Sequence, residues 1–155
     1  RGCTMTTEER LAEMGLVLPE AAAPVASYVP VIHYGGIAHI SGQLPFIDKA
    51  LVTGRLGADL VLEDGLKAAR ASAMMILAQL REASLLERVE RVLKLGAFVN
   101  STPDFTDQPK VANGASELMF EVFGEKGRHA RAAVGVSALP LGAAVEVDAV
   151  IAVSG

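Results

Sequence analysis

The 155 residues carry a formal net charge of −4, are 51% hydrophobic, and include one cysteine and no tryptophan. This length suits one domain that buries its core without metals or disulfide bridges, and the apolar fraction excludes a disordered chain. The acidic balance, without a run of basic residues, argues against nucleic-acid binding, because phosphate neutralisation drives that affinity. A single cysteine, Cys3, cannot form an intrachain disulfide, as is typical of proteins in a reducing cytoplasm.

No apolar run reaches the roughly 18 residues of a membrane-spanning helix, and no secretory signal is recognisable. We therefore expect a cytoplasmic protein without a membrane partner. Residues 6–14 are expected to form a short amphipathic helix, because Thr6 and Glu9 have capping-box spacing and Gly15 can end the helix. Residues 1–17 are then an N-terminal extension of one domain that spans residues 1–155.

The first half of the domain combines a hairpin with a long helix. Residues 31–34 and 37–42 are predicted strands around Gly35 and Gly36, a two-residue turn signal. Residues 48–60 form a polar excursion of low regularity. Apolar residues at helical spacing predict a helix over residues 63–83, with this core stripe: Leu66, Ala69, Ala73, Ile76, Leu77 and Leu80.

The second half adds three strands and a second helix. Residues 88–100 alternate in polarity, and the following residues are expected to share their buried face: Val89, Leu93, Leu95, Ala97 and Val99. A helix is predicted over residues 108–123, capped by Thr106 or Asp107 and ended by Gly124. Residues 131–137 and 143–153 are expected to form a closing hairpin. The order ββαβαββ predicts an α+β sandwich with both long helices on one sheet face.

The last predicted strand has two different faces. Val145, Val147 and Ile151 alternate with Glu146 and Asp148, so one face is apolar and the other carries acids. Alternate residues of a strand point to opposite faces of the sheet. On this basis we expect the acids to lie on the same face as the side of residues 131–137 that carries a single arginine. The small residues of that second face favour packing against another subunit, and a solvated sheet face is the alternative.

Arg131 is the most informative charged residue of these strands. Its planar guanidinium matches a carboxylate, and its small neighbours leave space for a ligand. A structural ion pair with Glu146, Asp148 or Glu121 is equally compatible with the sequence. Glu146 is either a structural anion or a group that orients a water molecule.

The three histidines, His33, His39 and His129, have no metal-ligand spacing, and no cofactor fingerprint is present. We therefore expect neither a metal nor a cofactor. His129 precedes Arg131 by two residues, so it either edges a pocket there or is a solvated loop histidine.

Three stretches resemble the RidA/YjgF family, also called the YjgF-like or L-PSP endoribonuclease family. They are Tyr28 with SGQLP at 41–45, VANGASELMFEVFG at 111–124, and HARAAVGVSALPLGAAVEVDAV at 129–150. The N-terminal helix and the excursion at 51–60 resemble a divergent subgroup. The resemblance implies a chorismate-mutase-like (ferredoxin-like) fold in a homotrimer, with small-molecule pockets in the clefts between subunits.

The resemblance also implies an activity, the hydrolysis of reactive enamines and imines such as 2-aminoacrylate or 2-iminopropanoate to a 2-keto acid and ammonia. It places Arg131 on the substrate carboxylate and Glu146 on the attacking water, without a cofactor. The family often has Ser and Cys in the positions of Ala132 and Ala133, which puts substrate preference in question. Further pocket residues are implied by the same resemblance: Tyr28, Ser41 and Asn113.

Two other functions are compatible with the same residues. A non-catalytic protein could hold a small carboxylate metabolite in the same cleft. RNA cleavage is attached to the family's older name, but the acidic balance and the absence of a basic or aromatic surface argue against it.

Overall fold

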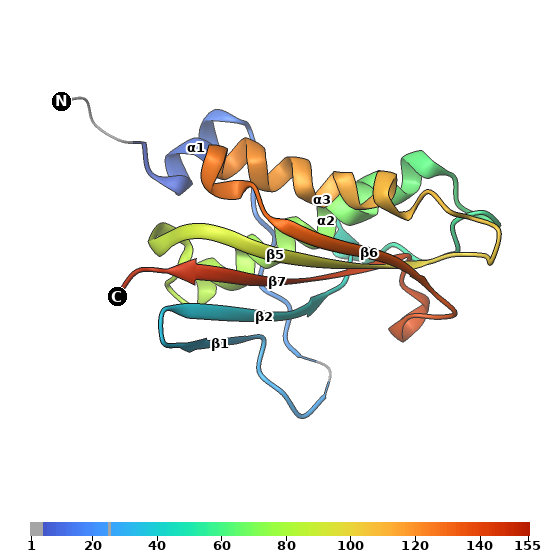
Figure 1. The fold of residues 1–155 in the computed structure, drawn as a ribbon, viewed down its shortest axis with the longest axis horizontal. Helices are drawn as coiled ribbons and strands as arrows, with labels where there is room; N and C mark the ends of the chain where they lie inside the picture. Colours follow the sequence, from blue (N-terminus) through green and yellow to red (C-terminus); the bar gives the residue numbers. More distant parts are fainter. Residues whose placement is uncertain (1–4, 25) are drawn as a thin grey trace.

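A five-stranded sheet with helices on one face forms the domain in the computed structural model, which describes residues 5–24 and 26–155 (Figure 1). Cys3 therefore lies outside the described residues. The predicted order ββαβαββ after an N-terminal helix is confirmed, with one small additional hairpin, β3–β4. The elements are α1 (Thr7–Glu13), β1 (Val31–Tyr34), β2 (Ile37–Gln43), β3 (Phe46–Ile47), β4 (Ala50–Leu51), α2 (Leu62–Glu82), β5 (Val89–Asn100), α3 (Gln108–Phe123), β6 (Ala130–Val136) and β7 (Val145–Val153).

The strand order in the sheet is β1-β2-β7-β5-β6. The predicted closing hairpin is wrong, because β6 pairs in parallel with β5 and β7 inserts between β2 and β5. The reason is topological. A strand, a crossover helix and a second strand return in the same direction and form a parallel pair, here β5-α3-β6. The most regularly apolar strand, β7, then occupies the centre of the sheet, and β6 is left at its edge.

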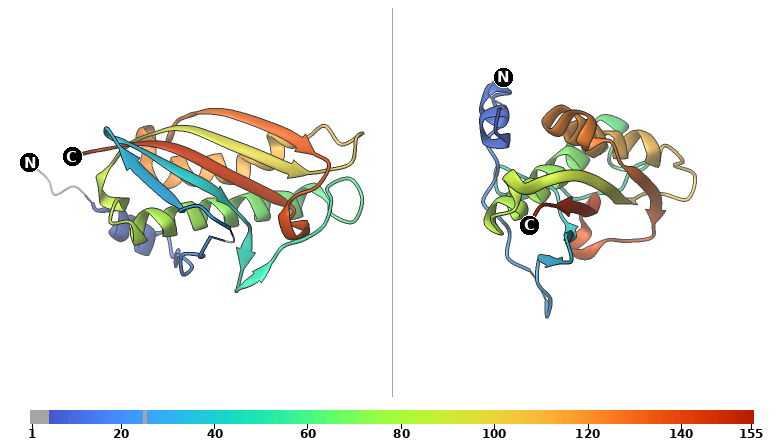
Figure 2. Two further views of the ribbon diagram at one scale, coloured as in Figure 1. Left: turned by 90° about the horizontal axis from the view of Figure 1, so that it is seen from below. Right: turned by 60° about the vertical axis from the view of Figure 1, so that its left-hand side comes forward.

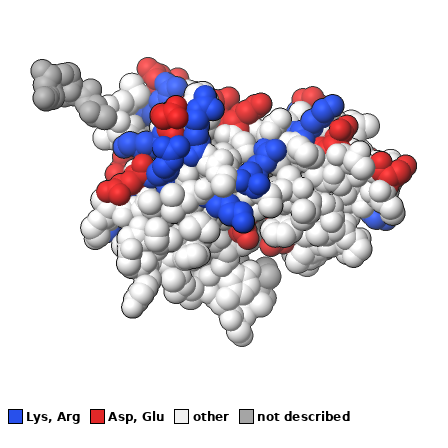
Figure 3. Space-filling view, in the orientation of Figure 1, with Lys and Arg blue, Asp and Glu red and all other residues white. Residues whose placement is uncertain are grey.

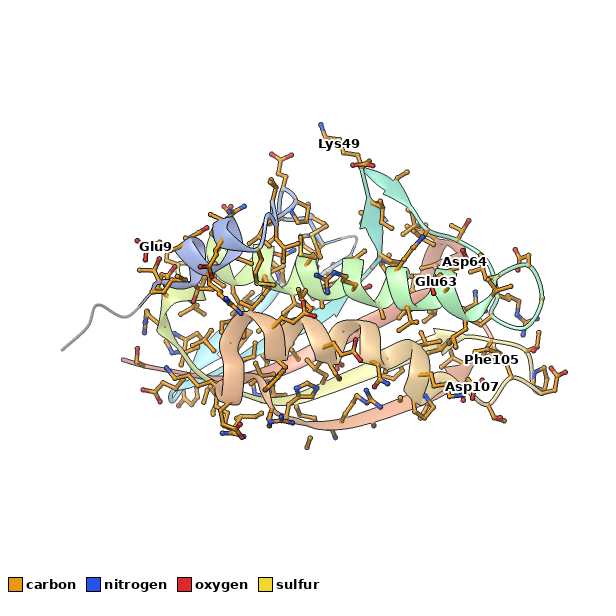
Figure 4. All side chains as sticks on the ribbon, turned by 90° about the horizontal axis from the view of Figure 1, so that it is seen from above. Glu9, Lys49, Glu63, Asp64, Phe105 and Asp107 are labelled. Atoms are coloured by element: carbon orange, nitrogen blue, oxygen red, sulfur yellow. The ribbon has the colours of Figure 1, made fainter. Side chains whose placement is uncertain are left out.

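Both long helices pack on one face of this sheet, as predicted. Figure 4 shows Asp64 at the start of α2 and Asp107 at the start of α3 at the same end of the molecule, so the helices run parallel. Their close contact depends on Gly114, where a β-carbon would overlap the carbonyl oxygen of Leu66. The left view of Figure 2 shows the opposite face of the sheet, which no helix covers.

The helix ends follow their sequence signals. Thr6 and Glu9 form the predicted capping box of α1. Asp107 is the N-cap residue of α3, although its side chain makes no capping hydrogen bond, and Gly124 ends the helix with a φ of 64°. The Nε of Arg10 donates to the carbonyl oxygen of Glu121 at 3.1 Å, which fixes α1 against the end of α3.

The prediction for β5 is partly wrong. Its pairing with β7 shifts register between Val89 and Arg91 and between Val92 and Lys94. Each irregularity adds a residue to the strand and changes which side chains face the core. Val92 is therefore fully buried and Leu93 is 37% exposed, the reverse of strict alternation. From Leu95 onward the predicted alternation is confirmed.

The core lies between α2, α3 and the helix-facing side of β7 and β5. Val145, Val147 and Ile151 are buried in it as predicted, and Val153 is buried there too. Each fully buried aliphatic side chain contributes roughly 1.5–3 kcal/mol. Within the described part of the chain, no helix has the length and hydropathy needed to cross a membrane.

Candidate functional site

Arg131 lies on the edge strand β6 and projects toward the helix layer. Its register partner in parallel β5 is Leu95, whose side chain is buried in the core, and paired residues of neighbouring strands point to the same face. Grouping Arg131 with the acidic face of the last strand was therefore wrong. The alternation of side chains within each strand was predicted correctly. Which side of β6 shares a face with the acids of β7 depends, however, on β5, which lies between the two strands.

Helix α3 holds the Arg131 guanidinium through three residues at helical spacing. Nη1 donates to Oδ1 of Asn113 at 2.9 Å and to Oγ of Ser116 at 3.1 Å, and Nη2 donates to the carbonyl oxygen of Pro109 at 3.3 Å. A guanidinium has five donor hydrogens. These bonds engage three of them and leave one on Nε and one on Nη2, the number that a two-oxygen carboxylate contact requires.

The charge of Arg131 is not neutralised by a neighbouring acid. Among the described residues, no carboxylate oxygen forms a salt bridge with Arg131. Glu121, one of the acids considered from sequence, instead pairs with Arg70 at 3.3 Å. The guanidinium is thus positioned by neutral acceptors and keeps its positive charge available for a ligand.

His129 is linked to Arg131 through Ser116. Its Nδ1 lies 2.6 Å from the carbonyl oxygen of Gly127 and its Nε2 lies 2.8 Å from Oγ of Ser116. Burial lowers the pKa of His129, the bond to Gly127 opposes this, and the charge of Arg131 lowers the pKa further. His129, Ser116 and Arg131 line a cavity of about 490 Å³, together with Glu117, Phe120, Gly127 and Arg128. His129 therefore lies at the edge of this cavity, beside Arg131.

A second group of predicted site residues lies on the uncovered face of the sheet. Between Ile40 and Gln43, which are both buried, β2 carries an irregularity that spans Ser41 and Gly42. The Oγ of Ser41 donates to the carbonyl oxygen of Val29 at 2.8 Å and so fixes the segment that follows Tyr28. Gly42 lies beneath Glu146, because a β-carbon at Gly42 would overlap the Glu146 carboxylate.

The acids of β7 share this uncovered face. Burial raises the pKa of the Glu146 carboxyl, and repulsion from Asp148 raises it further. Burial also raises the pKa of Asp148, opposed by a hydrogen bond from the Gly96 backbone and by the charge of Lys94. Both carboxyls therefore take up a proton more readily than an ordinary surface acid.

The six predicted residues thus form two groups that do not meet within one chain. Asn113, His129 and Arg131 lie at the edge strand on the helix side. The strand of Glu146 is two positions from β6, about 10 Å away at ordinary strand spacing, and Glu146 projects to the other face. Ser41 lies next to Gly42, which Glu146 covers on that face, and Tyr28 precedes β1 in the segment that Ser41 contacts.

Comparison with known proteins identifies the family to which this fold belongs. The sequence model of the family described as "YjgF/chorismate_mutase-like, putative endoribonuclease" matches residues 8–151. The chain belongs to the YjgF/RidA family. Protein TCP17 of Trypanosoma cruzi is 54% identical over 144 residues, which cover 91% of this chain and 90% of that protein.

Solved structures agree with the fold. Atu1372 of Agrobacterium tumefaciens, described as having unknown function, is 44% identical with a TM-score of 0.88, and the match covers 96% of this chain and 92% of that one. RidA of the Antarctic bacterium Psychrobacter sp. PAMC 21119 is 25% identical with a TM-score of 0.61, covering 86% and 94% of the two chains. The predicted family and its chorismate-mutase-like fold are thus confirmed.

A second and larger cavity of this YjgF/RidA family member lies elsewhere. It has a volume of about 880 Å³ and is bounded by the connector at residues 17–23, the β3–β4 hairpin and α2. Its lining is mostly aliphatic, with charged residues of both signs and none of the six predicted site residues. We regard the smaller cavity as the candidate site, because a free guanidinium, a histidine and a hydroxyl converge there. Figure 4 shows Lys49 at the tip of the hairpin, pointing away from α2.

Two residues of this candidate site, Ser116 and Pro109, were missed from the sequence. A signal for both was available, since Pro109, Asn113 and Ser116 recur at i, i+4 and i+7 and so share one face of α3. No group of three or more His, Cys, Asp or Glu residues in the described ranges is arranged to hold a metal ion.

Proposed function

We propose that this protein hydrolyses enamines and imines that carry a carboxylate, such as 2-aminoacrylate and 2-iminopropanoate, to a 2-keto acid and ammonia. The observation that carries the proposal is the free edge of Arg131, where one N–H on Nε and one on Nη2 lack a partner among the described residues. A carboxylate accepts two such parallel hydrogen bonds with its two oxygens. Membership of the YjgF/RidA family supports this substrate class.

The active site in this proposal is shared between subunits of a homotrimer. One chain supplies Arg131, Asn113 and His129, and a neighbouring chain supplies Tyr28, Ser41 and Glu146, because the two groups face different sides of one sheet. The uncovered face and the β1 edge expose large apolar side chains suited to such a contact. These are Tyr28, Val29, Ile32, Tyr34 and Val134.

The distribution of charge is compatible with this contact surface. Figure 3 shows charged side chains concentrated where the helices lie, whereas the lower part of the same view, around β1, carries almost none. Charged groups are costly to bury at an interface, and aromatic residues are enriched there. The β1 edge with Tyr28 and Tyr34 is therefore the part of the visible surface best suited to contact a second copy.

The reaction needs orientation more than a strong nucleophile. With the carboxylate on Arg131, the imine carbon is held at a fixed position in the cleft, which replaces a bimolecular encounter by an oriented one. Glu146 of the neighbouring subunit would hold the attacking water and accept its proton as the C–O bond forms. The tetrahedral intermediate then takes up a proton at nitrogen, its C–N bond breaks, ammonia leaves, and the 2-keto acid remains.

A competition assay tests this function. 2-Iminopropanoate is generated in situ, and semicarbazide competes with the protein for the imine, so hydrolysis lowers the yield of semicarbazone. We expect Arg131→Ala to lose on the order of 100-fold in kcat/KM, because two hydrogen bonds to a charged group are removed. Arg131→Lys is expected to recover little, because an ammonium cannot present the planar fork.

The matched control is Arg81→Ala, which removes an exposed arginine of α2 that pairs only loosely with Glu8 at 3.5 Å. This variant is expected to keep the full rate. Equal rates for wild type and Arg131→Ala would overturn the assignment of Arg131. Retained binding of a 2-keto acid with no acceleration of imine hydrolysis would show the alternative, a non-catalytic carboxylate-binding protein.

A further inference from the structure

The hydrogen bonds around Ser116 have a direction that the chemistry of the partners fixes. A carbonyl oxygen only accepts, so Nδ1 of His129 carries a proton that it donates to Gly127. In the neutral ring Nε2 is then an acceptor, and the Ser116 hydroxyl donates to it at 2.8 Å. Arg131 in turn donates to Oγ of Ser116 at 3.1 Å. These hydrogen bonds together form a relay, which runs from Arg131 through Ser116 to His129 and ends at the Gly127 backbone.

Cations dominate the surroundings of His129. The charged groups that line the same cavity are Arg131 from β6, Arg128 from the segment before it, and Glu117 from α3. Arg128 is partly neutralised by Glu125 at 3.2 Å and lies over the ring of Phe120, 4.3 Å from its centroid. Burial and Arg131 both lower the pKa of His129, so the ring is neutral in the absence of a ligand at neutral pH.

Protonation of His129 reverses one bond of the relay. Both ring nitrogens of an imidazolium are donors, so Nε2 would donate to Ser116 Oγ, which has two lone pairs and can accept from Arg131 at the same time. The Ser116 hydroxyl proton then turns away from the ring and becomes available to another acceptor. The change adds a positive charge and a free O–H group to a cavity that already contains Arg131.

We propose that His129, acting through Ser116, couples carboxylate binding at Arg131 to the uptake of a proton, so that the site binds anions more tightly as the pH falls. This inference rests on the proposed function, because it assumes that the ligand carboxylate binds Arg131. His129 and Ser116 are positioning residues in this arrangement. They hold Nη1 so that Nε and Nη2 face the ligand. The proton on His129 sets the affinity of the site for anions.

The experiment uses pyruvate as a stable carboxylate probe and isothermal titration calorimetry on the full chain between pH 5.5 and 8.5. We expect affinity to rise on the order of tenfold as the pH falls, and the heat to depend on the ionisation enthalpy of the buffer, as proton uptake requires. His129→Gln is expected to bind pyruvate at the high-pH level at every pH. Arg81→Ala, which changes an exposed arginine of α2 outside the site, is expected to keep the wild-type profile.

A second measurement uses the wild-type protein, so it does not depend on whether a variant folds. By linkage, bound pyruvate must raise the ring pKa of His129, which NMR titration of its Cε1–H signal detects. Arg131-dependent binding with the same affinity at every pH overturns the coupling and leaves the carboxylate site intact. The absence of Arg131-dependent pyruvate binding at any pH overturns the proposed function together with the coupling.

Discussion

Oδ1 of Asn113 accepts a hydrogen bond of 2.9 Å from Nη1 of Arg131, which joins the middle of α3 to the edge strand β6. Because the acceptor is a neutral amide, it orients the guanidinium without neutralising it. Ser116 and the Pro109 carbonyl act in the same way. On our proposal, this helix face of neutral acceptors is what leaves Arg131 free to bind a ligand instead of forming a structural ion pair.

Asn113→Asp tests this distinction. The new carboxylate would lie where Oδ1 now accepts from Arg131 and would compete with the ligand for the same positive charge. We expect pyruvate affinity to fall roughly tenfold, since a charged acceptor makes a stronger bond to the guanidinium than an amide does. Calorimetry measures the change. Lys110→Ala on the same helix, where the lysine pairs with Asp107 at 3.7 Å, serves as the control, and an unchanged affinity in Asn113→Asp would contradict the argument.

Gly114→Ala probes the contact between the two long helices. A β-carbon at this position would overlap the carbonyl oxygen of Leu66, which is backbone and cannot rotate away. We expect the free energy of unfolding to fall by about 1–3 kcal/mol, as in other overpacked cores. Urea denaturation followed by circular dichroism gives the value. A stability equal to that of wild type would mean that α2 and α3 can separate without cost.

Glu146→Gln should change stability in a pH-dependent way. The raised folded-state pKa of Glu146 means that its protonated form stabilises the fold below the ordinary carboxyl pKa of about 4, and that this stability is lost as the pH rises through the folded-state pKa. At pH 7 the neutral glutamine is therefore expected to be more stable than wild type. The gain should stay below about 1 kcal/mol, because the group is half-exposed and solvent screens it.

Thermal unfolding of Glu146→Gln and wild type at pH 7 and pH 3.5 checks this expectation, and the difference should vanish at the lower pH. Glu90→Gln, an exposed glutamate of β5, should show no such difference at either pH. A variant that is less stable than wild type at pH 7 would show that ionised Glu146 has a favourable partner in the assembled protein.

Val134→Glu tests the proposed assembly. Val134 is 46% exposed on the uncovered face of the edge strand, where a carboxylate would be buried without a partner if a second copy packs there. We expect light scattering coupled to size exclusion to report a trimer for wild type and a monomer for this variant. Val17→Glu, at a position that is 87% exposed in the connector, should leave the trimer intact. A monomeric wild type would refute the shared site.

Local sequence patterns were enough to predict the long helices and the strands of the main sheet, because caps, glycine turns and apolar periodicity are local signals. The capping box at Thr6, the turn at Gly35 and Gly36, and the bounds of α3 are confirmed in the structure for this reason. The motif resemblance also identified the family, since its three stretches are specific in combination.

Which side chains meet, by contrast, became clear from the folded arrangement alone. The insertion of β7 between β2 and β5 and the irregularities of β5 are set by long-range pairing, which no local pattern encodes. Arg131 and Glu146 are separated by 15 positions in the chain, yet they project from opposite faces of the sheet. The contacts of Arg131 with α3 arise because β6 returns parallel to β5 beneath that helix, which places the guanidinium against acceptors up to 22 residues earlier in the chain.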